Sequence, residues 1–384
     1  MSEGLNNPIA DSILKKRKKE RPFDIRGAYF RDQTAIIHSM GFRRLKNKTQ
    51  VFYSPQNDHI CTRIEHVLHV STIASSICKG LHLNIELAQA IALGHDIGHA
   101  PFGHAGEAKL DELMIQHNAG HFYHEVNSLR VLDYLDNYGK GLNLTYAVRD
   151  GIISHCGENF EQYVEICSEK KKLGQIENRN TNPVTYEGAV VRLADKIAYL
   201  GRDIEDAIVA GLIKDSDVPK KVRTLLGKKN GEIIDTLVKD VIEHSRVKGK
   251  IGLSSEKYEL MVKLKDFNYK CIYKHPRTIK MNQEAQNIIE ELFNGLLEKI
   301  KLYGLQTDCY DKDKNLAVKT FGRFILKRIN LYREELKKLQ LSVPSESFMV
   351  RVLTDYISGM TDSYVIKQLR LLKPELKADI APIF

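Results

Sequence analysis

The 384-residue sequence contains no run of about 20 consecutive apolar residues, the length that a membrane-spanning helix requires. Its N-terminal segment, MSEGLNNPIADSILKKRKKE, lacks the apolar core of a secretory signal peptide. The six cysteines are scattered and form no CxxC pair, which excludes the common zinc-ribbon spacing and a dense disulfide framework. A GxxxxGK phosphate-binding loop is also absent. We therefore expect a cytoplasmic protein with no membrane partner and with reduced, structural thiols.

Negative charge is in the minority, because 58 Lys and Arg residues face 49 Asp and Glu residues and leave a net charge of +9. A basic surface attracts phosphates, so nucleotides, nucleic acid and anionic lipid all fit this charge. Two short basic runs, at residues 15–19 and 170–172, are interpreted as solvated segments. Charge alone does not select the partner, and single-stranded nucleic acid stays open as one.

Alternating β-branched runs are nearly absent, and only residues 50–53 predict a short strand. Apolar residues instead recur with helical spacing almost throughout, which predicts an all-α fold. The expected helices are residues 62–81, 84–98, 105–116, 124–138, 144–155, 185–212, 231–246, 281–303, 314–340 and 345–373.

Changes in composition divide the chain into three parts. Residues 1–50 form a basic N-terminal arm and the start of the core, residues 51–213 form the core, and residues 214–384 form a helical C-terminal lobe. A basic stretch broken by Pro and Gly at residues 214–231 predicts the seam between the last two parts. Residues 168–183 are polar without periodicity and predict a surface loop.

His95 and Asp96 are adjacent at the point where an apolar helical pattern ends. Because neighbours on a helix diverge by about 100°, both can bind one ion only at a helix end, and other ligands must come from other helices. His66 and Asp195 are candidates, since each lies among apolar neighbours where an unpaired ionisable group is costly. Two imidazoles and two carboxylates suit Mn, Fe, Co or Mg better than structural zinc. Each residue alone fits an ordinary hydrogen-bonded role equally well.

A second group of ionisable residues follows in the segment HDIGHAPFGHAGE at residues 95–107. His99 lies four residues after His95, and His104 lies three residues before Glu107, a spacing that lets the latter two pair on one helix face. A carboxylate that orients a histidine is the usual arrangement for an acid or base. Glu107 also fits a first-turn acid that stabilises the helix N-terminus. His124 begins the next predicted helix, where a histidine of the cap region is the simpler interpretation.

The predicted helix 185–212 carries a polar stripe that contains Asp195, Tyr199 and Asp203. Such a stripe is either a solvated face or the lining of a cleft, and its start within an apolar run favours the cleft. Arg63 lies one turn before His66, where its guanidinium could hold phosphate oxygens near a metal.

Taken together, these residues resemble the HD-domain superfamily and, within it, the dGTPase-like deoxynucleoside triphosphate triphosphohydrolases. The resemblance is carried by FRRLKNKTQVF (42–52), TRIEHVLHV (62–70), HDIGHAPFGHAGE (95–107), FYHEVNSLR (122–130), RLADKIAYLGRDIEDAI (192–208), IYKHPRT (272–278) and DYISGMTDSY (355–364). The His-Asp pair alone is also found in nucleotidases, phosphodiesterases and alarmone hydrolases. One departure is Glu125, where many bacterial members carry Asn.

The resemblance implies an enzyme that hydrolyses a dNTP, with dGTP favoured, to deoxynucleoside and inorganic triphosphate. It implies a homo-oligomer, tetramer or hexamer, and a regulatory nucleotide as a further ligand. Mn is the favoured metal, and Mg would accompany the triphosphate. The resemblance implies metal ligation by His66, His95, Asp96 and Asp195, and catalysis by His104 and Glu107, with His99 and His124 near the triphosphate. It implies phosphate or sugar-edge contacts by Arg63, Lys196 and Tyr199. It also implies 3′-hydroxyl binding by Gln50 and Asp203 and sugar stacking by Tyr273.

Two alternatives stay open at this point. Another HD phosphohydrolase would act on nucleoside monophosphates or an alarmone. It is disfavoured by Lys196, Tyr199 and Asp203, which match the triphosphohydrolase pattern. A nucleic-acid-binding protein with a vestigial HD site would show strongly salt-dependent binding and no turnover.

Overall fold

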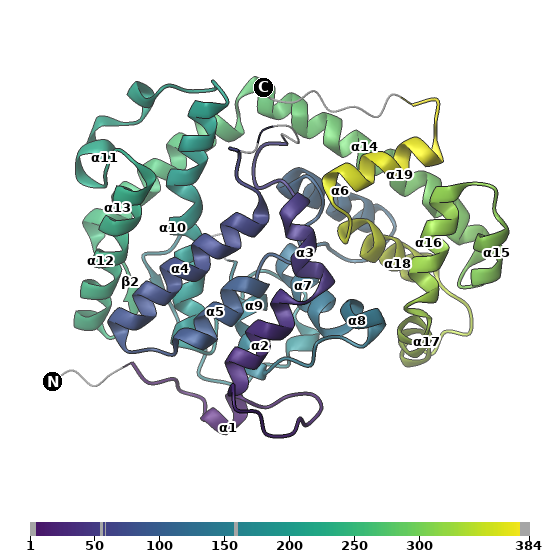
Figure 1. Ribbon diagram of the computed structural model, residues 1–384, viewed down its shortest axis with the longest axis horizontal. Helices are drawn as coiled ribbons and strands as arrows, with labels where there is room; N and C mark the ends of the chain where they lie inside the picture. The colour runs from purple at the N-terminus through teal and green to yellow at the C-terminus, as the bar shows by residue number, and fades with distance from the viewer. Residues whose placement is uncertain (1–4, 54–56, 58, 157–159, 377–384) are drawn as a thin grey trace.

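The computed structural model describes residues 5–53, 57, 59–156 and 160–376 of the chain. Helices dominate this part, which confirms the all-α prediction (Figure 1). Two short strands, β1 (Tyr163–Val164) and β2 (Ile251–Gly252), pair antiparallel with Tyr163 opposite Gly252. Among the helices of the described ranges, none is both long and apolar enough to cross a membrane.

The centre of the molecule is built around α4 (Arg63–Leu81), α5 (Ile85–Gly94) and α10 (Tyr186–Val209). α4 packs against both α5 and α10, while α9 (Tyr146–Ile153) and α2 (Ala28–Ile37) each pack on α5. Most side chains in these contacts are buried and aliphatic. Burial of such apolar faces, more than intrinsic helix propensity, stabilises helices of this length.

Side-chain caps fix where these helices begin. Asn84 caps α5, as predicted, and Thr62 and Glu65 form a capping box at the start of α4. Thr185 caps α10. Because a capped first turn sets the rotation of the whole helix, the caps determine which residues of α4 and α10 face the centre.

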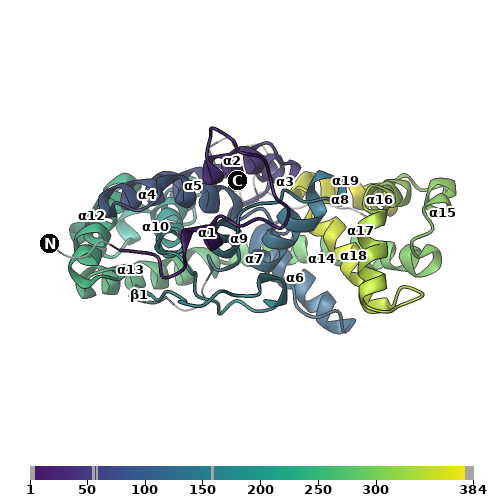
Figure 2. The same ribbon diagram turned by 90° about the horizontal axis from the view of Figure 1, so that it is seen from below.

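The C-terminal part is organised by α14 (Pro276–Tyr303), which packs against α6 (Gly103–Gln116), α18 and α19. Figures 1 and 2 show α12 and α13 at one end of the molecule and α15–α17 at the other, with α14 extending between them. The remaining helices are α1 (Asp11–Leu14), α3 (Met40–Arg44), α7 (His124–Arg130), α8 (Asp136–Gly139), α11 (Lys220–Leu225), α12 (Asn230–Lys248), α13 (Ser255–Asn268), α15 (Thr307–Lys312), α16 (Leu316–Leu326), α17 (Ile329–Lys338), α18 (Glu346–Ser358) and α19 (Asp362–Leu372).

The predicted strand at residues 50–53 is wrong. These residues form bends, and the neighbouring Thr49 makes only an isolated bridge with Thr62. The backbone N–H and hydroxyl of Thr49 both donate to the buried Asp362 carboxylate, at 2.7 and 2.5 Å. The segment is therefore held by a side chain from α19 rather than by a partner strand.

Three predicted helices are divided in the structure. Residues 124–138 form α7, a π-helical turn and α8, while residues 345–373 form α18 and α19. Residues 314–340 break at Arg328, whose φ of −122° is non-helical and whose Nε donates to Leu135 O at 3.0 Å. Apolar spacing continues across such breaks, so it does not reveal them. The short α11 lies in the predicted seam, and α13 is a helix that the apolar pattern did not predict.

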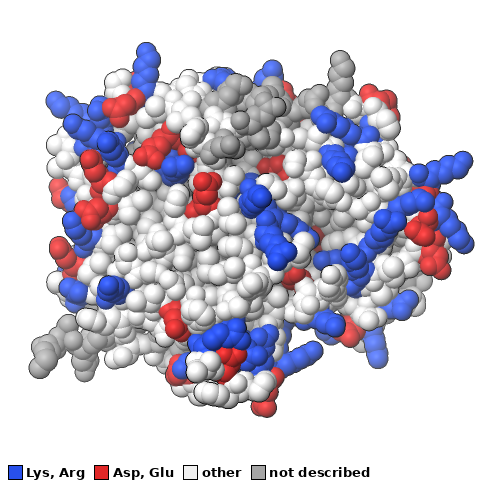
Figure 3. Space-filling model, in the orientation of Figure 1, with Lys and Arg blue, Asp and Glu red and all other residues white. Residues whose placement is uncertain are grey.

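The basic runs are only partly solvated. Arg17 donates to the fully buried Asp32 at 2.5 Å, and Lys171 pairs with the buried Asp150 at 2.6 Å, so the solvated interpretation is wrong for these two residues. Their neighbours in both runs are exposed. Figure 3 shows that Lys and Arg lie mostly along the edges of one face, on the left as well as on the right and below, around a broad and largely uncharged area.

Candidate active site

Two helices and the turn that follows a third bring the predicted metal ligands together. His66 lies on α4, Asp195 lies on α10, and His95 and Asp96 follow directly after α5. His66 Nε2 is 2.9 Å from Asp195 Oδ1 and 3.9 Å from Asp96 Oδ2. His95 Nε2 is 3.4 Å from Asp96 Oδ1 and 3.8 Å from Asp195 Oδ1. As expected for a helix end, the adjacent His95 and Asp96 reach the same point.

The turn that carries His95 and Asp96 is fixed against α7. Ser128 Oγ donates to His95 O at 2.6 Å, and Gly98 N donates to Ser128 Oγ at 2.8 Å. A Cβ on Gly98 would lie 2.1 Å from the backbone N of Ser128, so only glycine permits this approach. The turn that carries His95 and Asp96 is thus held rigidly by α7.

These residues fit a divalent metal ion. His95 Nδ1 donates to Ala92 O at 2.7 Å, which leaves Nε2 with a free lone pair, and that buried Nε2 has no hydrogen-bond partner. A buried polar atom without a partner is costly unless a ligand satisfies it. Donor atoms of His66, His95 and Asp96 lie within 4.8 Å of one another, and an imidazole whose second nitrogen is held by a carbonyl, as in His95, is typical of such a metal site.

Both carboxylates of the cluster stay ionised at neutral pH, as metal ligands must. Burial opposes ionisation of Asp96, but His99, His95 and Arg63 outweigh it and hold its pKa well below the usual range. Arg63 Nη1 donates to Asp96 Oδ2 at 2.6 Å. Burial is likewise outweighed at Asp195, where the hydrogen bond from His66 lowers the pKa to about 2.

The predicted pair His104 and Glu107 meets on α6, and the structure adds His124 to it. Glu107 accepts from His104 Nδ1 at 3.1 Å and from His124 Nδ1 at 3.0 Å. The rings of His99 and His124 stack with centroids 3.8 Å apart. Burial opposes protonation of His124, but Glu107 and Glu125 outweigh it and raise its pKa to about 9. The His104 side chain is 76% exposed, so its ring faces open space.

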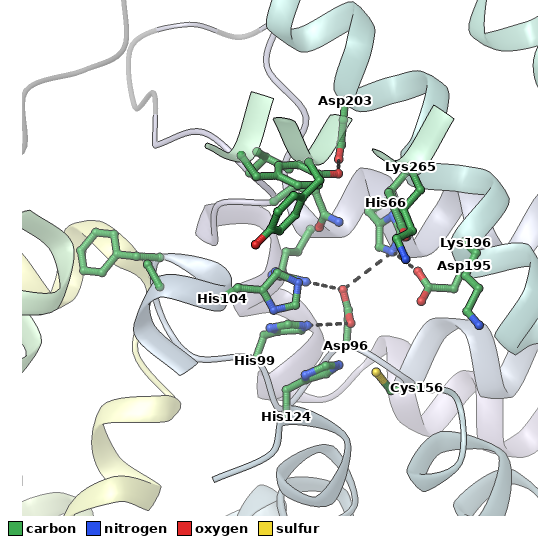
Figure 4. Close-up of a pocket in the computed structure, with 18 of the residues that line it drawn as sticks. His66, Asp96, His99, His104, His124, Cys156, Asp195, Lys196, Asp203 and Lys265 are labelled. Carbon is green, nitrogen blue, oxygen red and sulfur yellow. Dashed lines mark hydrogen bonds and ion pairs between the residues drawn. The ribbon is translucent and has the colours of Figure 1, made fainter. Parts of the chain in front are cut away.

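A cavity of about 430 Å³ opens beside the metal cluster (Figure 4). It connects the cluster at one end with Asp203 at the other. His95 and Glu107 lie behind its wall. The other predicted site residues all line it, namely Gln50, Arg63, His66, Asp96, His99, His104, His124, Asp195, Lys196, Tyr199, Asp203 and Tyr273.

The cavity lining also carries hydrogen-bond acceptors outside the metal cluster. Asp203 Oδ2 accepts from the Tyr273 hydroxyl at 2.5 Å, while Asp203 Oδ1 and Gln50 Oε1 are buried without a hydrogen-bond partner. Burial raises the pKa of Asp203 to about 7 despite the hydrogen bond from Tyr273. Two unsatisfied acceptors in one cavity favour a ligand that presents a donor there.

Sequence reasoning missed His155 and Lys265 in the cavity lining. His155 Nδ1 donates to Ile152 O at 2.6 Å, and its Nε2 lies 3.2 Å from His124 Nε2. A histidine at the end of an apolar helix was the signal already used for His95, so His155 could have been found. Lys265 lies on the unpredicted α13 and gave no comparable signal. The other missed lining residues include Cys156, Phe160, Tyr269, Thr278 and Asn282.

The surface loop at residues 168–183 also reaches the site, which its polar composition did not indicate. The loop is largely irregular, as predicted, and contains only a 3-10 turn at Leu173–Gln175. Arg179 from this loop donates to Glu107 and lies 3.2 Å from Glu125.

Comparison with known proteins shows which family the sequence matches. The HD domain family matches residues 63–200, inside the predicted core, and the phosphohydrolase-associated domain matches residues 251–315. A deoxyguanosinetriphosphate triphosphohydrolase-like protein of Caldanaerobacter subterraneus is 36% identical over 95% of this chain and 91% of its own length. A protein of the same name from Clostridium tetani is 38% identical over 91% of this chain and 86% of its own. A crystal structure of a hypothetical protein from Aquifex aeolicus aligns with a TM-score of 0.37 and 19% identity, over 80% of this chain and 70% of its own.

The identity and coverage of these relatives confirm the predicted resemblance, and the HD match identifies a hydrolase. The chain belongs to the family of deoxyguanosinetriphosphate triphosphohydrolase-like proteins, and its residues 63–200 form an HD domain.

Proposed function

We propose that this protein hydrolyses deoxynucleoside triphosphates, with dGTP favoured, to a deoxynucleoside and inorganic triphosphate. The observation that supports this most is a cavity whose lining combines the His-Asp cluster, cationic side chains and two buried acceptors without a hydrogen-bond partner. A phosphate ester of a sugar presents anionic oxygens to a metal and to cations, and it presents hydroxyl donors to such acceptors. The names of the relatives support the same substrate class.

We assign the metal to His66, His95, Asp96 and Asp195. A divalent ion there would polarise the α-phosphoryl group and lower the pKa of water, with Mn favoured over Fe, Co or Mg.

The chain's own residues would hold the substrate and move the proton. Arg63 would bind an α-phosphate oxygen, and Lys196 and Lys265 would bind the β- and γ-phosphates together with Mg²⁺. Burial lowers the pKa of Lys196 to about 8, so anionic phosphates would restore the charged form that burial disfavours. His104, whose Nδ1 is held by Glu107, would present Nε2 to the 5′-oxygen of the leaving nucleoside. His99 and His124 would lie beside the triphosphate.

The sugar end provides a test of specificity. Gln50 and Asp203 would bind the 3′-hydroxyl, while Tyr199 and Tyr273 would crowd the 2′ carbon. A site that crowds one atom rejects added bulk, and a site built to bond a hydroxyl rejects its absence. We expect GTP and 2′,3′-dideoxy-GTP to be turned over at least about a hundredfold less efficiently than dGTP, measured as kcat/KM. Turnover of GTP comparable to that of dGTP would contradict this assignment.

A turnover screen tests the proposed function. The four dNTPs are assayed singly and in pairs, with Mn²⁺ or Mg²⁺, and inorganic triphosphate is measured. Release of triphosphate from at least one dNTP is expected. Release of phosphate from nucleoside monophosphates, or of pyrophosphate from an alarmone, without dNTP turnover, would favour another HD phosphohydrolase. The homo-oligomer, the regulatory nucleotide and single-stranded nucleic acid stay predictions, and the paired-nucleotide assays address the second of them.

A further inference from the structure

Glu107 and Glu125 are two buried carboxylates beside the same histidine. Glu125 is fully buried, and Glu107 is 4% exposed. Glu107 Oε1 lies 3.0 Å and Glu125 Oε2 3.3 Å from Nδ1 of His124. Two carboxylates in one buried site repel each other, and one of them takes up a proton unless nearby cations balance both.

Arg179 is placed to balance this pair. Its Nη2 donates to Glu107 Oε1, its Nε lies 3.2 Å from Glu125 Oε1, and its guanidinium lies 4.7 Å above the ring of Tyr123. Arginine alone among the side chains offers a planar fork that can contact two carboxylates at once and still stack on an aromatic ring.

The loop that carries Arg179 is anchored on both sides of it. Lys171 pairs with the buried Asp150 at 2.6 Å, and Arg192 Nη1 donates to Thr181 O at 3.3 Å. The guanidinium is thus delivered by a fixed segment rather than by a free surface loop.

We propose that Arg179 is a positioning residue that keeps Glu107 and Glu125 ionised together, so that Glu107 holds His104 in its working orientation. This inference rests on the proposed function of the site. Arg179 is therefore the cation that the second carboxylate of this buried site requires.

The decisive experiment is a double-variant cycle on Arg179→Gln and Glu125→Gln. Arg179→Gln is expected to lower kcat for the best dNTP at least about tenfold with KM changed less than about threefold, because chemistry is impaired and binding is not. Glu125→Gln alone should stay within about threefold of the wild type. The double variant should recover to the level of Glu125→Gln, since one carboxylate needs only His124 as its cation. Arg179→Lys should be intermediate, because it keeps the charge but loses the fork.

The exposed Lys172→Gln in the same loop is the matched control and should behave as wild type. A double variant as slow as Arg179→Gln would overturn the proposal, because a residue that merely anchors the loop is not rescued by removing an acid. A raised KM with unchanged kcat would also overturn it, since Arg179 would then bind substrate directly. If Arg179→Gln does not fold, the proposal still requires the double variant to be folded and active.

Infrared difference spectra separate this inference from the proposed function, because they need no substrate. A band of a protonated carboxyl group should appear in Arg179→Gln relative to wild type and should be absent from the double variant. Its absence from Arg179→Gln would overturn the inference, even if the wild type hydrolyses dNTPs. A wild type that hydrolyses no dNTP would reject the proposed function, and the spectra would still test the charge balance.

Discussion

The Asp195→Ala variant is expected to lose turnover and to bind much less metal than the wild type. Asp195 Oδ1 lies within 3.8 Å of Nε2 on both His66 and His95, so its removal leaves two imidazoles and one carboxylate. Loss of an outer contact to a metal ligand already costs about 10–100-fold in affinity or activity, and loss of a ligand itself should exceed about a hundredfold. Metal content after dialysis and the rate of triphosphate release are measured on the same preparation.

The matched control is Asp235→Ala, which removes an exposed aspartate of α12 that pairs only with the exposed Lys239. This control should keep both metal and rate, because exposed ion pairs contribute little. Full metal content and a near-normal rate in Asp195→Ala would show that the ligand assignment is wrong.

The His104→Ala variant is expected to slow the reaction by roughly a hundredfold or more while the metal stays bound, as for the loss of a general acid. His104 takes no part in the metal cluster, and its Nδ1 is occupied by Glu107, so Nε2 is the nitrogen that can carry the proton. The rate and metal content are compared with those of His121→Ala. His121 is also exposed and also pairs with a carboxylate, Asp111, at 3.1 Å, but it lies outside the cavity lining. A His104→Ala enzyme as fast as this control would remove His104 from the mechanism.

The sequence predicted the helical class, and it singled out residues that the structure brings together in the cluster, because both leave local traces. Asn84 is a helix-capping residue and so predicts the start of α5, and His66 and Asp195 are polar residues within apolar helical patterns. The breaks at Arg328 and at residues 359–361 were missed because the helices on both sides keep their apolar faces. At Arg328 the break coincides with a distant contact, the hydrogen bond from its Nε to Leu135 O.

In the candidate site too, contacts between residues close in the sequence could be predicted, and contacts between distant residues could not. The pairing of His104 with Glu107 follows from their spacing, but the contact of both with His124 depends on how α7 packs against α6. Arg179 could not be predicted to reach the site, because a polar loop without periodicity gives no signal of what its side chains contact. Its carboxylate partners come from residues 54 and 72 positions away in the chain.

The bond that breaks is the central claim of the proposed mechanism. Attack at the α-phosphorus can expel pyrophosphate or the 5′-oxygen of the nucleoside, and the 5′-alkoxide is the poorer leaving group. An acid beside the 5′-oxygen would make that route accessible, and we propose that His104 supplies it. The most direct measurement is therefore chromatography and phosphorus NMR of the products of dGTP with Mn²⁺ or Mg²⁺. We predict deoxyguanosine and intact inorganic triphosphate, whereas dGMP with pyrophosphate, or dGDP with phosphate, would contradict the mechanism.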